Sequence, residues 1–195
     1  MSTSNASTLQ AEARTAARVI MEGGTILYPT DTIWGVGADA TSRTAVARVY
    51  RIKRRPDHKS MLVLVPHKEM LANYIEQLPE NLDALLKRSG KPTTIIYPDA
   101  RNLPAELTGT DGTVGIRITT DPFCLRLLKL TGVPLVSTSA NLSGDPPPAR
   151  FTEIGEIIRS EVDYVVNWRH EDTSPAAPST ILRLEKNGDL TVLRP

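Results

Sequence analysis

Apolar and polar positions recur along this chain with two different periods, which predict an order of helices and strands. Between Thr8 and Ile20 the apolar side chains fall on one helical face, and Gly23-Gly24 ends that helix. Short apolar runs bounded by Ser, Pro or Gly predict strands instead. We expect helices at 8–22, 44–52, 67–76, 80–88, 121–130 and 151–160, and strands at 25–28, 61–65, 93–97, 113–118, 134–137, 163–166, 180–184 and 190–193.

The order of these elements predicts the fold class. Helices and strands mostly alternate, which is typical of an α/β fold with a mixed sheet. Asp121-Pro122 is a strong helix start, and Asn187-Gly188 predicts a hairpin turn between the last two strands. Residues 29–41 show no clear period and are expected to be irregular. Because no Pro/Gly/Ser-rich linker divides the chain, we expect one domain over 8–195, preceded by a disordered tail at 1–7.

The composition of the chain argues against a disordered, a membrane-spanning or a disulfide-bonded protein. The chain has 195 residues, of which 40% are hydrophobic and 23% charged, so it can bury a core and is not globally disordered. No apolar run approaches the ~20 residues needed to cross a bilayer, and residues 1–7 lack the apolar region of a signal peptide. A single cysteine, Cys124, excludes an intrachain disulfide, and one cysteine with three histidines cannot form a structural zinc site. We therefore expect a cytoplasmic protein.

The charge is nearly balanced overall, at +1, but it is concentrated in one segment. Residues 48–59 contain six cations and one acid. Such a run is typical of a solvated helix end, where the helix dipole stabilises cations. It also suits a phosphate site, because Pro56 ends the helix and lets Lys53, Arg55 and Lys59 turn into one loop.

Two polar segments follow predicted strands, at Tyr28–Thr32 (YPTDT) and Ser137–Gly144 (STSANLSG). Open α/β sheets bind ligands beyond the carboxyl ends of their strands, so hydroxyl, amide and carboxylate groups there are candidates for ligand contacts. The alternative is that both segments are turns whose side chains bond to their own backbone.

A third segment, Gly35–Ala40 (GVGADA), formally matches the G-x-G-x-x-G/A fingerprint of dinucleotide-binding folds. That fingerprint must turn from a strand directly into a helix, whereas here the next helix begins only near Ser42. We therefore reject a dinucleotide site, and no P-loop occurs elsewhere. The two glycines are expected to let the backbone bend close beneath a ligand.

Taken together, these segments resemble the YrdC/Sua5 family of threonylcarbamoyl-AMP synthases. The similar segments are YPTDTIWGVGADAT, IKRRPDHKSMLVLV, VGIRI, PLVSTSANLSGDPPP, PSTILRL and the terminal LRP. They keep the family's order from about residue 23 to 195, as in its short, single-domain form. The sequence departs from the pattern at Trp34, Val36 and Gly90–Thr94, and Leu64 stands where many longer members have a histidine.

The resemblance implies that L-threonine, bicarbonate and ATP give threonylcarbamoyl-AMP and pyrophosphate, with Mg²⁺ on the phosphates. The product would feed N6-threonylcarbamoyladenosine (t6A) formation in tRNA through downstream transferase proteins. It implies a twisted mixed sheet with an open basic cleft and no metal site made by the protein. Lys53 and Arg55 are the expected catalytic residues. Those expected around ATP are Arg55, Lys59, Thr94, Ser139, Asn141, Pro147 and Arg194, and those around threonine are Thr32, Arg117, Ser137 and Ser179.

Two other functions remain open. A double-stranded RNA or tRNA-binding module could use the same basic segment, and a ribosome-maturation factor could act by binding alone. An RNA surface that reads shape needs cations spread over a wide face. Here the cations are concentrated in one segment beside hydroxyl-rich strand ends, which favours a small-molecule phosphate site.

Overall fold

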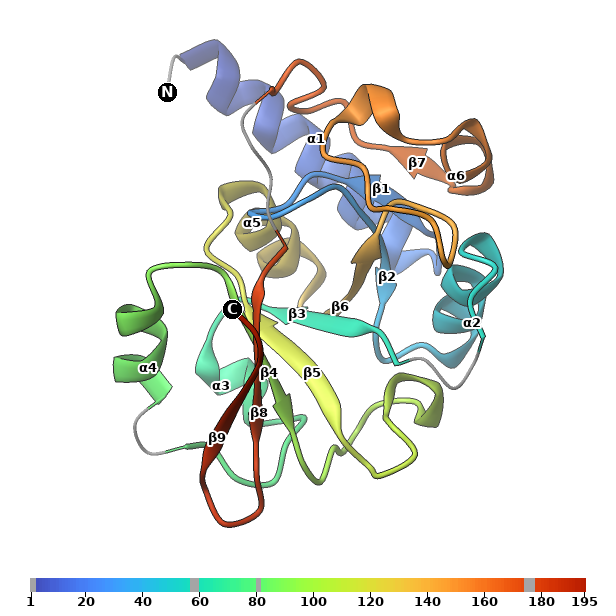
Figure 1. The fold of residues 1–195 in the computed structure, drawn as a ribbon. Helices are drawn as coiled ribbons and strands as arrows, with labels where there is room; N and C mark the ends of the chain where they lie inside the picture. The colour runs from blue at the N-terminus through green and yellow to red at the C-terminus, as the bar shows by residue number, and fades with distance from the viewer. Residues whose placement is uncertain (1–2, 57–59, 80–81, 174–177) are drawn as a thin grey trace.

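The computed structural model describes residues 3–56, 60–79, 82–173 and 178–195. Its described strands form one sheet in the order β7-β1-β2-β6-β3-β5-β4-β8-β9 (Figure 1). Three neighbouring pairs are parallel, β7–β1, β3–β5 and β4–β8, and the others are antiparallel. The sheet is therefore mixed and flanked by helices, as predicted. The strands are β1 (Ile26–Tyr28), β2 (Gly35–Asp39), β3 (Leu62–Val65), β4 (Thr93–Tyr97), β5 (Val114–Ile118), β6 (Leu135–Ser139), β7 (Tyr164–Val165), β8 (Thr180–Leu184) and β9 (Leu190–Arg194).

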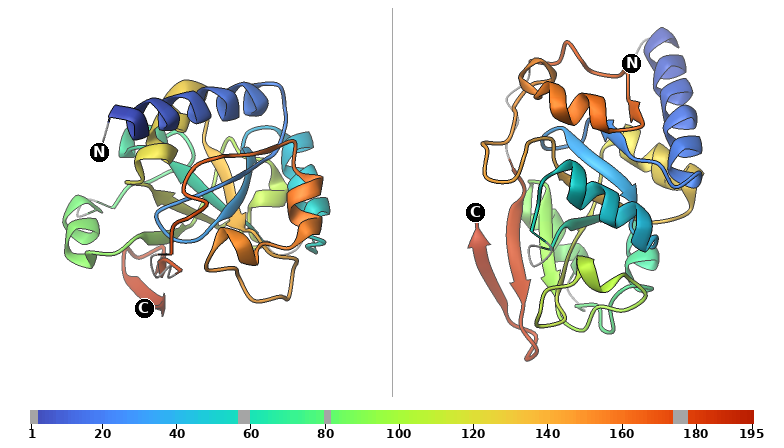
Figure 2. Two further views of the ribbon diagram at one scale, coloured as in Figure 1. Left: turned by 90° about the horizontal axis from the view of Figure 1, so that it is seen from above. Right: turned by 90° about the vertical axis from the view of Figure 1, so that its right-hand side faces the viewer.

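Helices cover both faces of this sheet. The helices are α1 (Thr3–Met21), α2 (Arg43–Ile52), α3 (Lys68–Leu71), α4 (Leu82–Ser89), α5 (Pro122–Thr131) and α6 (Glu156–Glu161), with short 3₁₀ turns η1 (Ala105–Leu107) and η2 (Phe151–Glu153). Helices α1 and α5 pack against each other on one face, and α2 and α6 lie together on the other side (Figure 2).

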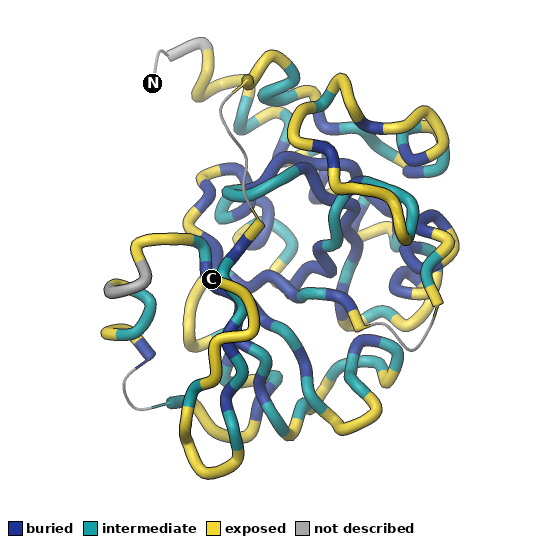
Figure 3. The backbone as a smooth tube through the Cα atoms, viewed as in Figure 1, coloured by how far each residue is buried: buried dark blue, intermediate teal, exposed yellow. Residues whose placement is uncertain are grey.

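Alternation along the strands divides the core into two clusters, because successive side chains point to opposite faces. Ile26, Leu64 and Leu135 pack with α1 and α5. Leu27 and Val136 pack with α2 on the opposite face. The central strands are consequently buried on both sides (Figure 3), which explains their nearly continuous apolar runs.

Local signals set several element ends where they were predicted. Ser42 caps α2 by accepting a hydrogen bond from Ala45 N, and Asp121 caps α5 by accepting from Cys124 N. The β8–β9 hairpin turns at Gly188, whose φ of 89° suits glycine.

Other predicted boundaries were wrong. Helix α1 begins at Thr3, so residues 3–7, expected in a disordered tail, are helical. The helix expected over 67–76 ends at Leu71. Asn73 N and Tyr74 N donate to carbonyls three residues earlier, and the carbonyls of residues 72–74 accept hydrogen bonds from residues 101 and 102. The helix expected over 151–160 is divided into η2 and α6 by extended backbone at Ile154 and Gly155.

Strand β2 was missed altogether, because glycine is unfavourable in strands. Its sequence, GVGAD, pairs with β1 and β6. A Cβ on Gly37 would lie 2.6 Å from Cε1 of the buried Tyr28 ring and 3.0 Å from Val136 O. The Tyr28 ring therefore occupies the space that a side chain on Gly37 would need. This corrects the expectation that Gly37 lets the backbone bend close beneath a ligand.

We expect Gly37→Ala to lower the free energy of unfolding by about 1–3 kcal/mol, because neither the buried ring nor the Val136 carbonyl can move away cheaply. Urea unfolding measures this change. Gly115→Ala is the matched control within a strand, since the nearest atom to a new Cβ there is Thr94 Cγ2, at an ordinary contact distance of 3.6 Å. Equal stability of the two variants would contradict the steric role of Tyr28.

Candidate active site

A cavity of about 270 Å³ lies beside the middle strands of the sheet. The loop after β1, the carboxyl half of β6, the start of β3, β5 and the β8–β9 region all contribute to its wall. Its lining residues are Thr32, Ile33, Trp34, Gly35, Arg55, Ser60, Met61, Leu62, Arg117, Ser137, Thr138, Ser139, Pro147, Pro178, Ser179 and Arg194.

Arg117 is the buried cation of this cavity, with only 2% of its side chain exposed. It extends from β5 to the YPTDT loop, where its Nη2 lies 3.1 Å from Asp31 Oδ1 and its Nη1 donates to Thr32 Oγ1 at 3.2 Å. Within the described part of the chain, Arg117 Nε and Asp31 Oδ1 are buried without a hydrogen-bond partner. The guanidinium thus retains hydrogen-bonding capacity that a carboxylate ligand could use.

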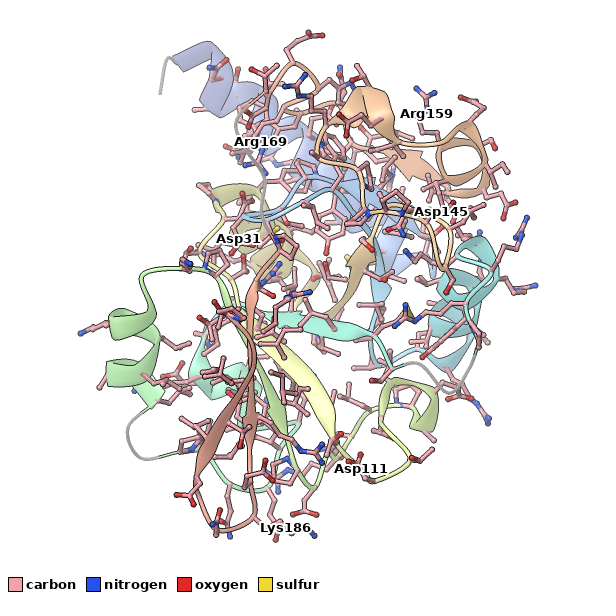
Figure 4. The ribbon with its side chains drawn as sticks, in the orientation of Figure 1. Asp31, Asp111, Asp145, Arg159, Arg169 and Lys186 are labelled. Carbon is pink, nitrogen blue, oxygen red and sulfur yellow. The ribbon has the colours of Figure 1, made fainter. Side chains whose placement is uncertain are left out.

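The YPTDT loop is held in place by its own hydroxyls and by a second loop. Thr30 Oγ1 donates to Ile33 O at 2.8 Å, as the turn interpretation of this segment requires. Arg169, labelled in Figure 4, donates to Thr30 O at 2.9 Å and forms an ion pair with the buried Asp121 at 3.0 Å. The loop is therefore both a stabilised turn and a wall of the cavity.

The serines of the STSANLSG segment belong partly to a strand. Strand β6 continues to Ser139, two residues beyond the predicted end. Leu135, Ser137 and Ser139 share one face of it, so the face that is apolar at Leu135 becomes polar at the cavity. Gly35 lies opposite Ser139, and a Cβ on Gly35 would lie 3.3 Å from Ser137 Oγ, so the glycine lets this serine hydroxyl sit close to β2.

Ser179 and Arg194, from the C-terminal part of the chain, form a further part of the cavity wall. The hydroxyls of Thr94 and Ser179 share a hydrogen bond of 2.8 Å. Arg194 on β9 donates from Nε and Nη2 to Ser179 O at 3.0 and 2.7 Å. These contacts bring the terminal LRP segment to the cavity, where the resemblance expected it.

Arg55 enters the cavity from the loop after α2. It is half-buried, and its Nη2 donates to Ser60 O at 2.8 Å. Burial lowers the pKa of its guanidinium from the ordinary value. Arginine nevertheless remains charged at neutral pH, so Arg55 presents a partly desolvated cation to the cavity.

Lys53 lies outside the cavity lining, with only 1% of the residue exposed. Its ammonium donates to the main-chain carbonyls of Ser139 and Asn141. Burial, and secondly the Arg55 cation, lower its pKa to about 7. The side chain therefore binds the main chain of the segment that forms this part of the cavity wall, on the side away from the cavity.

The cavity brings together most of the residues that were expected to bind ligands: Thr32, Arg55, Arg117, Ser137, Ser139, Pro147, Ser179 and Arg194. Lys53, Thr94 and Asn141 are not among its lining residues, although each contacts a residue of that wall or its loop. Lys59 lies outside the described residues. Leu64 packs in the core formed with α1 and α5 and does not line the cavity.

Among the residues of the site that the candidate set omitted, Asp31 and Trp34 make specific contacts. Asp31 pairs with Arg117, and its place inside YPTDT was the available signal. Trp34 lines the cavity and packs against Phe151 and His170, with ring centroids 4.9 and 5.4 Å apart. Phe151 and His170 come from distant segments, so spacing along the sequence could not reveal this aromatic cluster.

Comparison with known proteins relates this arrangement to a family. A threonylcarbamoyl-AMP synthase of Pseudomonas paraeruginosa is 37% identical over 155 residues, which cover 79% of this chain and 83% of that protein. A Sua5 variant from P. abyssi superposes with a TM-score of 0.85 at 29% identity, covering 95% of this chain and 56% of that one. A structure of P. abyssi Sua5 complexed with L-threonine gives a TM-score of 0.83 at 28% identity, covering 95% of this chain and 54% of that one.

The chain thus spans little more than half the length of P. abyssi Sua5 but most of the length of the bacterial relative. The family model Sua5/YciO/YrdC, described by the words "telomere recombination", matches residues 18–195. This match extends over nearly all the strands and helices that build the cavity. The chain belongs to the Sua5/YciO/YrdC family.

Proposed function

We propose that this protein synthesises threonylcarbamoyl-AMP from L-threonine, bicarbonate and ATP and releases pyrophosphate. One observation carries the proposal: a single cavity combines a buried arginine beside hydroxyl groups, Arg117, with two further arginines, Arg55 and Arg194. The first suits an amino-acid carboxylate and the others suit phosphates. The names of the relatives, and the L-threonine in the P. abyssi complex, support the same activity.

In this proposal threonine lies against Thr32, Arg117, Ser137 and Ser179, with its carboxylate on Arg117. ATP lies toward Arg55, Ser139, Pro147 and Arg194, with Thr94 and Asn141 supporting its wall. The threonine amine first forms a bond to the carbon of bicarbonate, and loss of water gives threonylcarbamate. An oxygen of this carbamate attacks the α-phosphorus, the bond from that phosphorus to the bridging oxygen breaks, and pyrophosphate leaves with the electron pair. Negative charge gathers on the phosphoryl oxygens, so the contribution of the arginines is positioning and charge stabilisation.

Mg²⁺ belongs to the proposal as a partner of the ATP phosphates. Among the described residues there is no group of three or more His, Cys, Asp or Glu that could hold a metal ion. In this proposal the ion is therefore bound by water molecules and substrate phosphates, as Mg²⁺ commonly is. When bound, the ion would neutralise phosphate charge.

The product is proposed to supply t6A formation in tRNA through downstream transferase proteins.

Direct RNA binding receives less support from the basic segment. Two of its arginines, Arg48 and Arg54, form ion pairs with Asp163 and Glu161, so part of its charge is already compensated. No helix among the described residues is long and apolar enough to cross a membrane.

Incubation of the purified chain with ATP, bicarbonate, Mg²⁺ and labelled threonine tests the activity. The expected products are a threonine-labelled adenylate and an equal amount of pyrophosphate. Omission of bicarbonate should abolish both. Pyrophosphate release that needs neither threonine nor bicarbonate would contradict the proposal.

Amino-acid selectivity tests the threonine half of the site. Serine lacks one methyl group, which is worth only ~1–3 kcal/mol in an apolar pocket, so serine should be used ~10–200-fold less efficiently. Valine lacks the hydroxyl and should be used less well than serine, because buried polar partners would be left unpaired. The measurement is kcat/KM for the three amino acids at saturating ATP and bicarbonate. Equal use of valine and threonine would contradict side-chain recognition by the YPTDT hydroxyls.

A further inference from the structure

Lys53 connects two segments that line the cavity from different elements. Its ammonium, at the end of α2, donates to Ser139 O and, at 2.6 Å, to Asn141 O. In return, Ser143 N donates to Lys53 O at 2.8 Å. The side chain and the main chain of one residue thus bind three positions along the segment 139–143.

This segment also has bonds of its own, but they do not attach it to α2. Asn141 Nδ2 donates to Leu142 O at 2.8 Å and to Asp145 O at 2.7 Å, which closes the loop on itself. The contacts through Lys53 are therefore what relate the loop to the segment carrying Arg55. Arg55 and Ser139 line the same cavity. The sheet holds the start of the loop, because Ser139 pairs with Gly35 and Ala140 N donates to Trp34 O at 3.0 Å, and the contacts through Lys53 join this loop to the segment that carries Arg55.

The position of the ammonium argues against direct contact with a phosphate. Lys53 is almost completely buried and does not line the cavity. Two of its three N–H groups are used by carbonyl oxygens, and the ammonium also lies 3.5 Å from Ser139 Oγ. Moving the ammonium out to a phosphate would leave both carbonyls buried without partners at an appreciable cost.

We propose that Lys53 is a positioning residue that fixes the loop 139–143 against the end of α2, so that Ser139 and Arg55 face one ligand. This inference rests on the proposed function for the identity of that ligand, and it replaces the catalytic, phosphate-binding role expected from the sequence. Loss of the ammonium should loosen the loop beyond Ser139 and disturb its position relative to Arg55, while Arg55 remains able to bind phosphate.

Lys53→Met, which retains the length of the aliphatic chain, separates the two roles, with Arg55→Ala as the comparison. Amide hydrogen exchange of residues 139–143 should become at least ~10-fold faster in Lys53→Met and change less than twofold in Arg55→Ala. Binding of inorganic pyrophosphate, followed by calorimetry, should change less than ~3-fold in Lys53→Met. A phosphate ligand predicts the reverse: unchanged exchange in the loop and a loss of pyrophosphate binding at least as large as that of Arg55→Ala.

Kinetics supply a third readout. If the protein makes the adenylate, Lys53→Met should lower kcat at least ~10-fold more than it raises KM for ATP, because the loop is misplaced while phosphate binding persists. If Lys53→Met does not fold, Lys53→Gln, which keeps a shorter donor, is used for the same measurements. Unchanged loop exchange in a folded variant overturns the proposal. Because exchange and pyrophosphate binding need no turnover, they remain decisive even if the proposed synthase activity is absent.

Discussion

Arg117→Met is expected to lower kcat/KM for threonine by more than about 100-fold and to lower the free energy of unfolding by about 3–5 kcal/mol. The loss of stability follows because Asp31 loses the cation that lies 3.1 Å away in a buried site. The loss of activity follows because two charge-assisted hydrogen bonds to a carboxylate are together worth about 3 kcal/mol or more. Steady-state kinetics and urea unfolding measure the two effects separately.

The double variant Asp31→Asn with Arg117→Met distinguishes stability from binding. It removes both charges of the pair, so most of the lost stability should return. Threonine use should stay low, because no cation remains for the carboxylate. Recovery of activity together with stability would show that Arg117 serves the fold and does not bind threonine.

Arg55→Ala is expected to lower the rate of adenylate synthesis by about 100-fold or more. A charge-assisted contact to a phosphate in a site that excludes water is worth about 2.7–4 kcal/mol. The half-buried guanidinium of Arg55 lies in the cavity wall and so suits such a contact. Single-turnover measurement of pyrophosphate release at saturating substrates gives the loss directly.

The neighbouring Arg54→Ala is the matched control, since it removes the same charge one residue away. Arg54 is exposed and pairs with Glu161, and this pairing raises its pKa. Exposed ion pairs contribute little to stability, so the variant should keep its rate within about twofold. Equal losses in the two variants would mean that the basic segment acts only through its general charge.

Elements with strong local signals were predictable from the sequence. Asp121 and Pro122 begin α5, and the Asn187-Gly188 pair turns the last hairpin, because caps and turns depend on residues close in the chain. The chemistry of the cavity was also largely predictable. Hydroxyls in YPTDT and STSANLSG, together with Arg117 and Arg194, occur in recognisable motifs, and the structure brings them to one cavity.

Features that depend on distant partners were not predictable. GVGAD forms β2 because it pairs with β1 and β6, and the Tyr28 ring fills the space beside Gly37. The segment after α3 leaves the helix and is bonded to residues 101 and 102. In each case a contact made far along the chain outweighs the local preference.

Lys53 and Arg55 lie in one motif, yet their roles could be predicted from the sequence only in part. The sequence alone indicates that several cations follow α2. The contacts made in the folded protein place Arg55 in the cavity wall and bury Lys53 against the carbonyls of Ser139 and Asn141. The physical reason is that a buried ammonium requires hydrogen-bond acceptors, and those acceptors lie on a loop more than eighty residues away along the chain.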